Sequence, residues 1–210
     1  MSRIGRDSRP LTKLQVLRRW VMEHLGSDRH ERRVSAIARR LVSVTSTLHD
    51  LETRELRLLR MASLVHDVGR HAGEREHPSV GADMLLDDDS LPLKNRHRRA
   101  LAYLTLYHRD EVPDVGEELV LRRGDNAERL RLVLAFLRAA DSLDSRSLPA
   151  PKLLIRRRGR RLRIVCRVPQ DSAKARRVFA RRKKFRLLEE LLGCKVDLIV
   201  TPRRRLKIAA

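Results

Sequence analysis

From residue 11 to about residue 144 the chain repeats one hydrophobic pattern, in which apolar residues recur every three or four positions between short polar stretches. This spacing is typical of amphipathic helices. Residues 28–48 show it most clearly, because an apolar stripe runs through them and Asp28, with Glu31 three positions later, forms a candidate capping box. The predicted helices cover residues 11–24, 28–48, 53–69, a segment beginning at His77-Pro78, 94–108 and 127–143. The pattern predicts a mainly α bundle.

The pattern changes after Pro149 and Pro151. Short stretches of alternating apolar and basic residues, separated by an Arg-rich turn at Gly159, are typical of a β-hairpin. A helix with Asp171 at its N-cap and Gly193 after its end follows. The predicted elements are strands over 153–155, 162–168 and 195–201 and a helix over 171–192. We therefore expect a helical domain over residues 1–148 and a small α+β (hairpin, helix, strand) subdomain over 149–210.

Composition excludes several classes of protein. The chain has 210 residues, of which 41% are hydrophobic, so it can bury a sizeable core and is neither a disulfide-stapled miniprotein nor a disordered chain. No apolar run approaches the roughly 18 residues that cross a bilayer, and no apolar segment follows the basic N-terminus as in a secretory signal. Cys166 and Cys194 form no CxxC pair. We expect a cytoplasmic protein with reduced cysteines and no membrane partner.

The net charge of +21 is distributed unevenly: residues 1–150 hold 27 basic and 23 acidic residues, whereas residues 151–210 hold 21 and 4. Such a surface attracts polyanions, including polyphosphate and RNA. The alternative is a solvated Arg-rich surface without a partner, since a GC-rich genome also favours arginine. With only Phe179 and Phe185 nearby, phosphate contacts are favoured over base stacking. The candidate polyanion-binding residues are Arg161, Arg163, Lys174, Arg177, Arg181 and Lys184.

Histidine and aspartate residues stand at the ends or on the apolar faces of successive predicted helices. They are His30, His66, Asp67, His77, His108 and Asp141. Imidazole and carboxylate together suit divalent transition metals such as Mn, Fe, Co, Ni or Zn. Asp141 interrupts an apolar helix face, and a buried carboxylate needs a cation or hydrogen-bond donors around it. The alternative interpretation is a set of capped helix ends and one internally hydrogen-bonded acid.

The order His30, His66-Asp67, Asp141 resembles the H…HD…D pattern of the HD-domain superfamily, which consists of all-helical, metal-dependent phosphohydrolases. More specifically, four segments are similar to the C-terminal HD-type region of the exopolyphosphatase and guanosine pentaphosphate phosphatase family: LVHDVGR, EHPSVGADMLL, LYHRDEVP and LVLAFLRAADSLDSRS. The resemblance extends from about Trp20 to Val200 and makes residues 1–148 an HD-type helical domain. The actin-like half in which that family's polyphosphate chemistry takes place has no counterpart in these 210 residues. Exopolyphosphatase activity is therefore not carried over.

The resemblance implies a site for one or two divalent ions (Mn, Fe, Co, Ni, Zn or Mg). His30, His66, Asp67 and Asp141 match the core ligands, and His77 and His108 fall where binuclear members place additional ligands. The implied reaction is hydrolysis of a phosphate ester or anhydride, on a nucleotide, a guanosine polyphosphate or a polyphosphate-like anion. Asp67 would bridge the ions, and Arg70 and Arg109 would neutralise charge on the phosphoryl group. RNA and a second copy of the chain are further expected partners. The competing hypothesis is a non-catalytic polyanion-binding or regulatory module.

Overall fold

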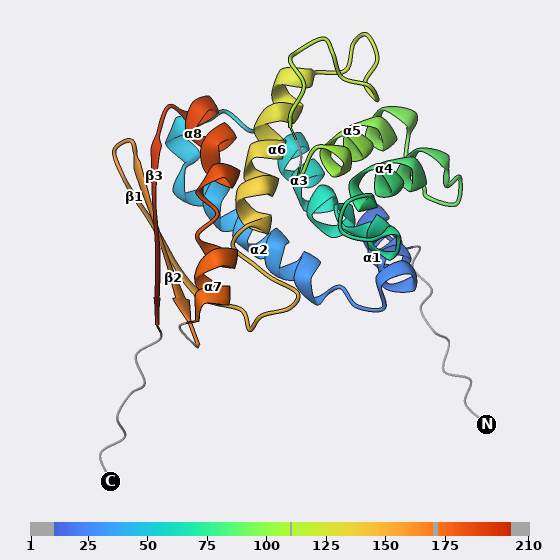
Figure 1. Cartoon of the computed structure of the whole chain (residues 1–210). Coiled ribbons are helices and arrows are strands. Elements are labelled where there is room, and N and C mark those ends of the chain that lie inside the picture. The colour runs from blue at the N-terminus through green and yellow to red at the C-terminus, as the bar shows by residue number, and fades with distance from the viewer. Residues whose placement is uncertain (1–10, 110, 170–171, 203–210) are drawn as a thin grey trace, which may run out of the picture.

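Helical periodicity produces a bundle of six α-helices in the computed structural model, which describes residues 11–109, 111–169 and 172–202 (Figure 1). The helices are α1 (Lys13–Leu25), α2 (Arg29–Val44), α3 (Thr53–Val65), α4 (His77–Asp87), α5 (Asn95–Leu106) and α6 (Ala127–Asp141). Two short 3-10 helices, η1 (Ser46–Leu48) and η2 (Val68–Ala72), follow α2 and α3. Helix α6 packs against α2, α3 and α5 and is the centre of the bundle, with Phe136 and Leu137 completely buried.

The predicted helix ends are partly confirmed. Helix α1 ends at Gly26, whose φ of 68° is the left-handed conformation that glycine adopts without strain. Asp28 occupies the N-cap position of α2, but its side chain makes no capping bond and accepts instead from Arg18 Nε. Glu31 is fully buried and pairs with Arg146. The predicted capping box is wrong because both carboxylates bind arginines from other segments.

The C-terminal segment forms a three-stranded sheet in the order β1 (Lys152–Arg158), β2 (Arg161–Val168), β3 (Lys195–Pro202). Strands β1 and β2 are antiparallel, and β2 and β3 are parallel. The inward face of β2 is buried and apolar, whereas its outward face carries exposed arginines. Helices α7 (Ala173–Phe179) and α8 (Arg186–Leu192) lie between the sheet and α6 (Figure 1).

The predicted helix over 171–192 is wrong as a single element. It divides into α7, the 3-10 helix η3 (Arg182–Phe185) and α8. On a continuous helix Phe179 and Phe185 would point about 120° apart, whereas the break allows both rings to be buried, at 1% and 0% exposure. Asp171, the predicted N-cap, lies outside the described residues; the Ser172 side chain caps α7 by accepting from Ala175 N.

The fold class is confirmed as a mainly α bundle with a small C-terminal α+β part. The two parts share packing contacts, since α8 and η3 contact α6 and β1 contacts α2. Among the described residues, no helix combines the length and apolar character needed to cross a bilayer.

Candidate metal centre

The ends of five helices converge on one buried point. His30 stands in the first turn of α2, the pair His66-Asp67 directly follows α3, and His77 begins α4. His108 follows α5, and Asp141 is the last residue of α6. Because all of these residues lie in or next to the first or last turn of a helix, their side chains can point to the same place.

Two glycines permit this approach. Gly69, in η2, lies against the backbone of α4: a Cβ on Gly69 would lie 2.5 Å from Gly81 N and closer still to His77 O. Neither Gly69 nor Gly81 has a positive φ, so space rather than backbone conformation requires glycine here. This contact brings the His66-Asp67 pair next to His77.

The donor atoms form two clusters, each within 4.8 Å. One consists of His30, His66 and Asp141, and the other consists of Asp67, His77 and His108. Asp67 lies between the clusters. Its Oδ1 atom is 3.2 Å from His77 Nε2 and 3.9 Å from His66 Nε2, and its Oδ2 atom is 3.8 Å from His30 Nε2. All six predicted ligands are therefore brought together, with the Asp67 carboxylate shared.

Each imidazole is oriented by a hydrogen bond behind it. Nδ1 donates to Asp144 Oδ2 in His30 (2.7 Å), to Ser63 O in His66 (3.1 Å), to Glu74 O in His77 (3.0 Å) and to Thr105 O in His108 (2.6 Å). A backbone carbonyl only accepts, so Nδ1 carries the proton and the Nε2 atom faces the centre. Outer hydrogen bonds of this kind orient metal-ligating histidines.

The residues present fit a divalent cation. His66 Nε2 is buried and has no hydrogen-bond partner among the described residues. His77 Nε2 and His108 Nε2 face each other at 3.3 Å, although Nδ1 of both donates to carbonyls. Nitrogen lone pairs at this separation require a cation or an extra proton between them. With two carboxylates beside them, they form a nitrogen and oxygen donor set suited to Mn, Fe, Co, Ni or Zn.

Electrostatics hold the carboxylates in the ionised form that ligands need. Burial opposes ionisation of Asp67, but His66, His108 and His77 outweigh it and keep its pKa well below the usual range. Burial also opposes a charge on His30, yet Asp141 and Asp144 raise the pKa of that imidazole to about 9. Burial lowers the pKa of His108 and favours its neutral form. The cluster thus combines ionised carboxylates on Asp67 and Asp141 with a neutral His108, while the raised pKa values of His30 and His66 favour their protonated forms in the absence of an ion.

The match with a family model decides what this arrangement is: the model of the HD domain matches residues 27–146 of the chain. The chain belongs to the HD-domain family. No curated protein matches it. HD domains bind divalent metals and make up a superfamily of metal-dependent phosphohydrolases, and all six predicted ligands lie within the matched segment.

Two charged residues beside the ligands of this HD domain, Asp144 and Arg146, are not marked by the hydrophobic pattern. Asp144 accepts from both His30 Nδ1 and Arg33 Nε, each at 2.7 Å. Arg146 donates from Nε to Asp67 Oδ2 at 3.0 Å and also pairs with the buried Glu31. Both residues lie just after α6, and their proximity to Asp141 in the sequence was the available signal.

The two predicted catalytic arginines lie at the edge of the HD-domain site. Arg70 Nη1 is 3.5 Å from Asp67 Oδ2, and its Nη2 donates to Glu74 at 2.8 Å. Arg109 Nη1 donates to the same Glu74 carboxylate at 2.9 Å. The two side chains are 31% and 26% exposed, so both guanidinium groups are reachable from solvent. Their catalytic roles stay predictions.

The predicted polyanion-binding residues do not form one groove. Arg161 and Arg163 are exposed on the outward face of the sheet, whereas Lys174, Arg177 and Arg181 are exposed on or just after α7, which covers the other face.

Lys184, a candidate polyanion-binding residue, is buried rather than exposed to a ligand. This residue is 6% exposed, and its Nζ atom donates to the carbonyls of His108 and Arg109 at 3.3 and 3.1 Å. The division of the helix at η3 turns Lys184 inward. It therefore supports the segment that carries a candidate metal ligand.

Proposed function

We propose that this HD domain is a metal-dependent phosphohydrolase that cleaves a phosphate ester or anhydride. The observation that carries the proposal is the pair of donor clusters sharing Asp67, in which every imidazole presents Nε2 to the centre. His30, His66 and Asp141 would hold one divalent ion, and His77 and His108 a second, with Asp67 common to both. A bound ion supplies Lewis acidity and lowers the pKa of water toward neutrality.

The residues at the edge favour an anionic, phosphorylated substrate. Glu74 accepts from both Arg70 and Arg109 and so holds two guanidinium groups beside the clusters. Arg146, whose side chain is 27% exposed, adds a third next to Asp67. Guanidinium groups bind phosphoryl oxygens in bidentate fashion. We propose that Asp67, Arg70 and Arg109 are catalytic residues and that Arg146 assists them.

The substrate class follows from the resemblance noted in the sequence. The similarity to the HD-type region of the exopolyphosphatase and guanosine pentaphosphate phosphatase family supports a nucleotide, a guanosine polyphosphate or a polyphosphate-like anion as substrate. The concentration of arginines at the edge is consistent with a substrate that carries several phosphates.

The test is elemental analysis of the purified wild-type protein, His66→Ala and Asp67→Asn, followed by a screen of phosphate monoesters, diesters and anhydrides with Mn, Co, Ni or Mg. His71→Ala is the matched control, because the His71 side chain is exposed and makes no hydrogen bond or ion pair with the described residues. We expect one or two metal equivalents and turnover in wild type and control, and loss of both in the two site variants. Unchanged metal content in His66→Ala and Asp67→Asn would refute the ligand assignment, and metal without turnover on any substrate would refute the enzymatic function.

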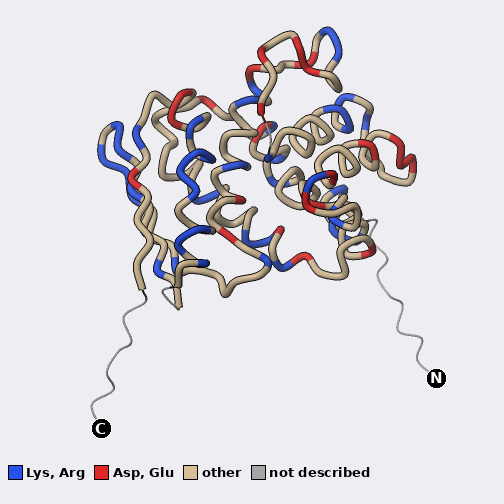
Figure 2. The backbone as a smooth tube through the Cα atoms, viewed as in Figure 1, with Lys and Arg blue, Asp and Glu red and all other residues tan. Residues whose placement is uncertain are grey.

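A second candidate function, polyanion binding by residues 149–210 as a separate domain, is favoured by the outward face of the sheet. Three cationic pairs stand directly opposite each other on β1 and β2: Lys152 and Arg167, Arg156 and Arg163, and Arg158 and Arg161. Figure 2 shows this concentration of basic residues along the hairpin. Like charges directly opposite destabilise a sheet, and a chain of phosphates would remove that repulsion.

This second function is tested by filter binding of polyphosphate and of single-stranded RNA to wild type and Arg156→Gln/Arg163→Gln across a series of salt concentrations. The matched control is Arg39→Gln/Arg40→Gln, which removes two exposed cations from α2. We expect weaker binding and a shallower salt dependence only in the sheet variant. Equal losses in both variants would show nonspecific charge attraction and refute a defined binding face.

A further inference from the structure

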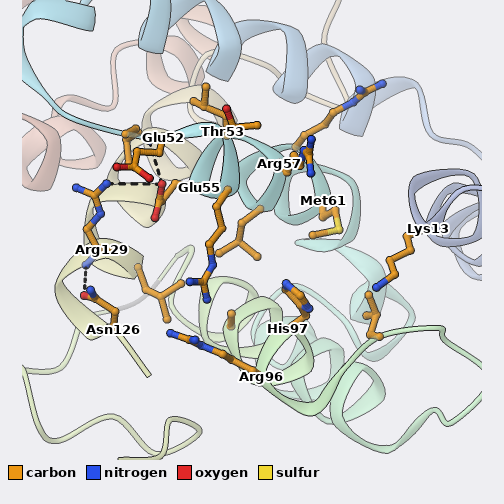
Figure 3. A pocket seen from close by; sticks show the side chains of 18 of the residues that line it. Lys13, Glu52, Thr53, Glu55, Arg57, Met61, Arg96, His97, Asn126 and Arg129 are labelled. Carbon is orange, nitrogen blue, oxygen red and sulfur yellow. Dashed lines mark hydrogen bonds and ion pairs between the residues drawn. The ribbon is translucent and has the colours of Figure 1, made fainter. Parts of the chain in front are cut away.

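A large cavity lies away from the candidate metal centre. Its volume is about 1370 Å³, and it is lined by the N-terminal part of α1, most of α3 and the first turns of α5 and α6. None of the six candidate metal ligands lines it. In Figure 3, Arg129 and Glu52 lie at one end, Lys13 lies at the opposite side, and Arg96 and His97 of α5 face α3 across the hollow.

The lining has an excess of unpaired positive charge. It holds six cationic side chains and three carboxylates, and the carboxylates already have partners. Glu52 and Glu55 form the capping box of α3, and Asp125 pairs with Arg99 at 2.7 Å and with Arg96 at 3.7 Å. Arg129 pairs with Asp50. Within the described part of the chain, no carboxylate pairs with the remaining cations Lys13, Arg54, Arg57 and Arg60. The cavity therefore offers several charges to an anion from outside.

Four cations, two of them from this set, gather around the imidazole of His97. In the part of the chain that the structure describes, His97 Nδ1 is buried without a hydrogen-bond partner. The pKa of His97 is lowered, first by burial and then by repulsion from Lys13, Arg54, Lys94 and Arg96. Because these four residues belong to α1, α3 and the start of α5, three separate segments direct positive charge to the same place. Asp125 approaches Arg96 at 3.7 Å, but among the described residues no carboxylate pairs with Lys13, Arg54 or Lys94, so the convergence favours an anion here.

The rest of the cavity wall is apolar rather than charged. Leu14, Leu58, Met61, Leu93, Ala100 and Leu130 give it an apolar surface. A ligand that satisfies both parts carries several negative charges on one side and a flat or apolar group on the other. Pockets that hold drug-sized ligands have volumes of about 300–1,000 Å³, so the space is sufficient for such a molecule.

We propose that this cavity is a second binding site, separate from the metal centre, for a nucleotide that carries two or more phosphates. The phosphates contact Lys13, Arg54 and Arg96, and the base and sugar lie against the apolar wall. Three helices link the two sites: α3, α5 and α6 each begin at the cavity and end next to His66-Asp67, His108 and Asp141 respectively. A nucleotide bound here holds the far ends of the helices that carry the candidate ligands.

The test is isothermal titration calorimetry of the full chain with ATP, with tripolyphosphate and with adenosine. The cavity variant is Lys13→Gln/Arg54→Gln, and its matched control is Arg39→Gln/Arg40→Gln; all four residues are exposed, so neither variant removes a core contact. Asp67→Asn is included to separate binding here from binding at the metal centre. We expect ATP to bind more tightly than either fragment and to lose roughly tenfold or more in affinity only in the cavity variant, since each charged hydrogen bond contributes about that factor.

Any of the following results would overturn the proposal. ATP binding that is lost in Asp67→Asn and retained in Lys13→Gln/Arg54→Gln would place the nucleotide at the metal centre. Equal losses in the cavity variant and its control would indicate nonspecific charge attraction. Tripolyphosphate that binds as tightly as ATP would show that the apolar wall takes no part, and absence of ATP binding would exclude the site. None of these outcomes depends on phosphohydrolase activity, so the proposed function and this inference fail separately.

Discussion

Replacement of Gly69 by alanine tests whether the close contact between η2 and α4 assembles the metal centre. The added Cβ would lie 2.5 Å from Gly81 N and closer still to His77 O, both of them backbone atoms. Ordinary contact begins at 3.4 Å, so α4 must move by about 1 Å. Overpacking of a core costs about 1–3 kcal/mol, and we expect about 3 kcal/mol here because backbone atoms cannot rotate away.

The same displacement separates His77 from Asp67, whose Nε2 and Oδ1 atoms are 3.2 Å apart. We therefore expect Gly69→Ala to bind metal more weakly as well as to unfold more easily. The free energy of unfolding is measured by urea denaturation with EDTA present, which removes the contribution of the ion. Metal affinity is then measured by titration with Mn under native conditions.

Gly81→Ala is the matched control on the other side of the contact. Its Cβ would meet Thr105 Cγ2, a side-chain methyl group, at 3.0 Å and Gly69 N at 3.2 Å. Gly81 lies inside α4, where alanine is favoured over glycine by about 1 kcal/mol, so we expect a net loss of less than about 1 kcal/mol. Equal stability of the two variants, or full metal affinity in Gly69→Ala, would refute the argument that this contact sets the site.

Three further predictions concern side chains around the site and the sheet. Lys184→Met keeps the buried volume but removes the donor to the His108 and Arg109 carbonyls, so we expect a loss of about 1–3 kcal/mol in stability and weaker Mn binding. Lys183→Met, a change at the exposed neighbour, is expected to leave stability and Mn binding unchanged. Equal behaviour of the two variants would contradict the supporting role of Lys184. Asp144→Asn weakens the hydrogen bond that orients His30, so we expect Mn affinity, measured by titration, to fall about 10- to 100-fold. An unaltered affinity would show that this hydrogen bond is dispensable. Burial raises the pKa of Cys166 to about 12 and also raises that of Cys194. Neither thiol is therefore expected to react with a thiol reagent at pH 8 until urea unfolds the chain. Rapid labelling of the native protein would show that the sheet opens.

Local periodicity was sufficient to predict the bundle and the hairpin. The stripe through residues 28–48 and the alternation in 162–168 arise from one buried face, and each face is visible in the order of residues alone. The six candidate ligands could also be proposed from the sequence, because His and Asp residues stand at the ends or on the apolar faces of successive predicted helices and their order resembles the HD pattern. The hydrophobic pattern does not identify which residues distant in the sequence contact one another.

The errors share this physical cause. Asp28 and Glu31 have the spacing of a capping box, but Arg18 and Arg146 bind them instead, and Arg146 is 115 positions from Glu31. Lys184 fits an exposed position on a continuous helix, yet tertiary packing of Phe179 and Phe185 breaks that helix and turns the lysine inward. Competition between a local signal and a distant partner cannot be decided from the order of residues in one segment.

The order in which the ligands occur along the chain has a consequence for folding kinetics. His30 comes from the second helix and Asp141 from the end of the sixth, so the intervening helices must be in place before all the donors meet. Closing a loop of that length costs entropy that no ion repays until the last helix docks. We therefore expect the metal contacts to form after the rate-limiting step of folding. An ion added to the chain is expected to slow its unfolding and to leave its folding rate almost unchanged.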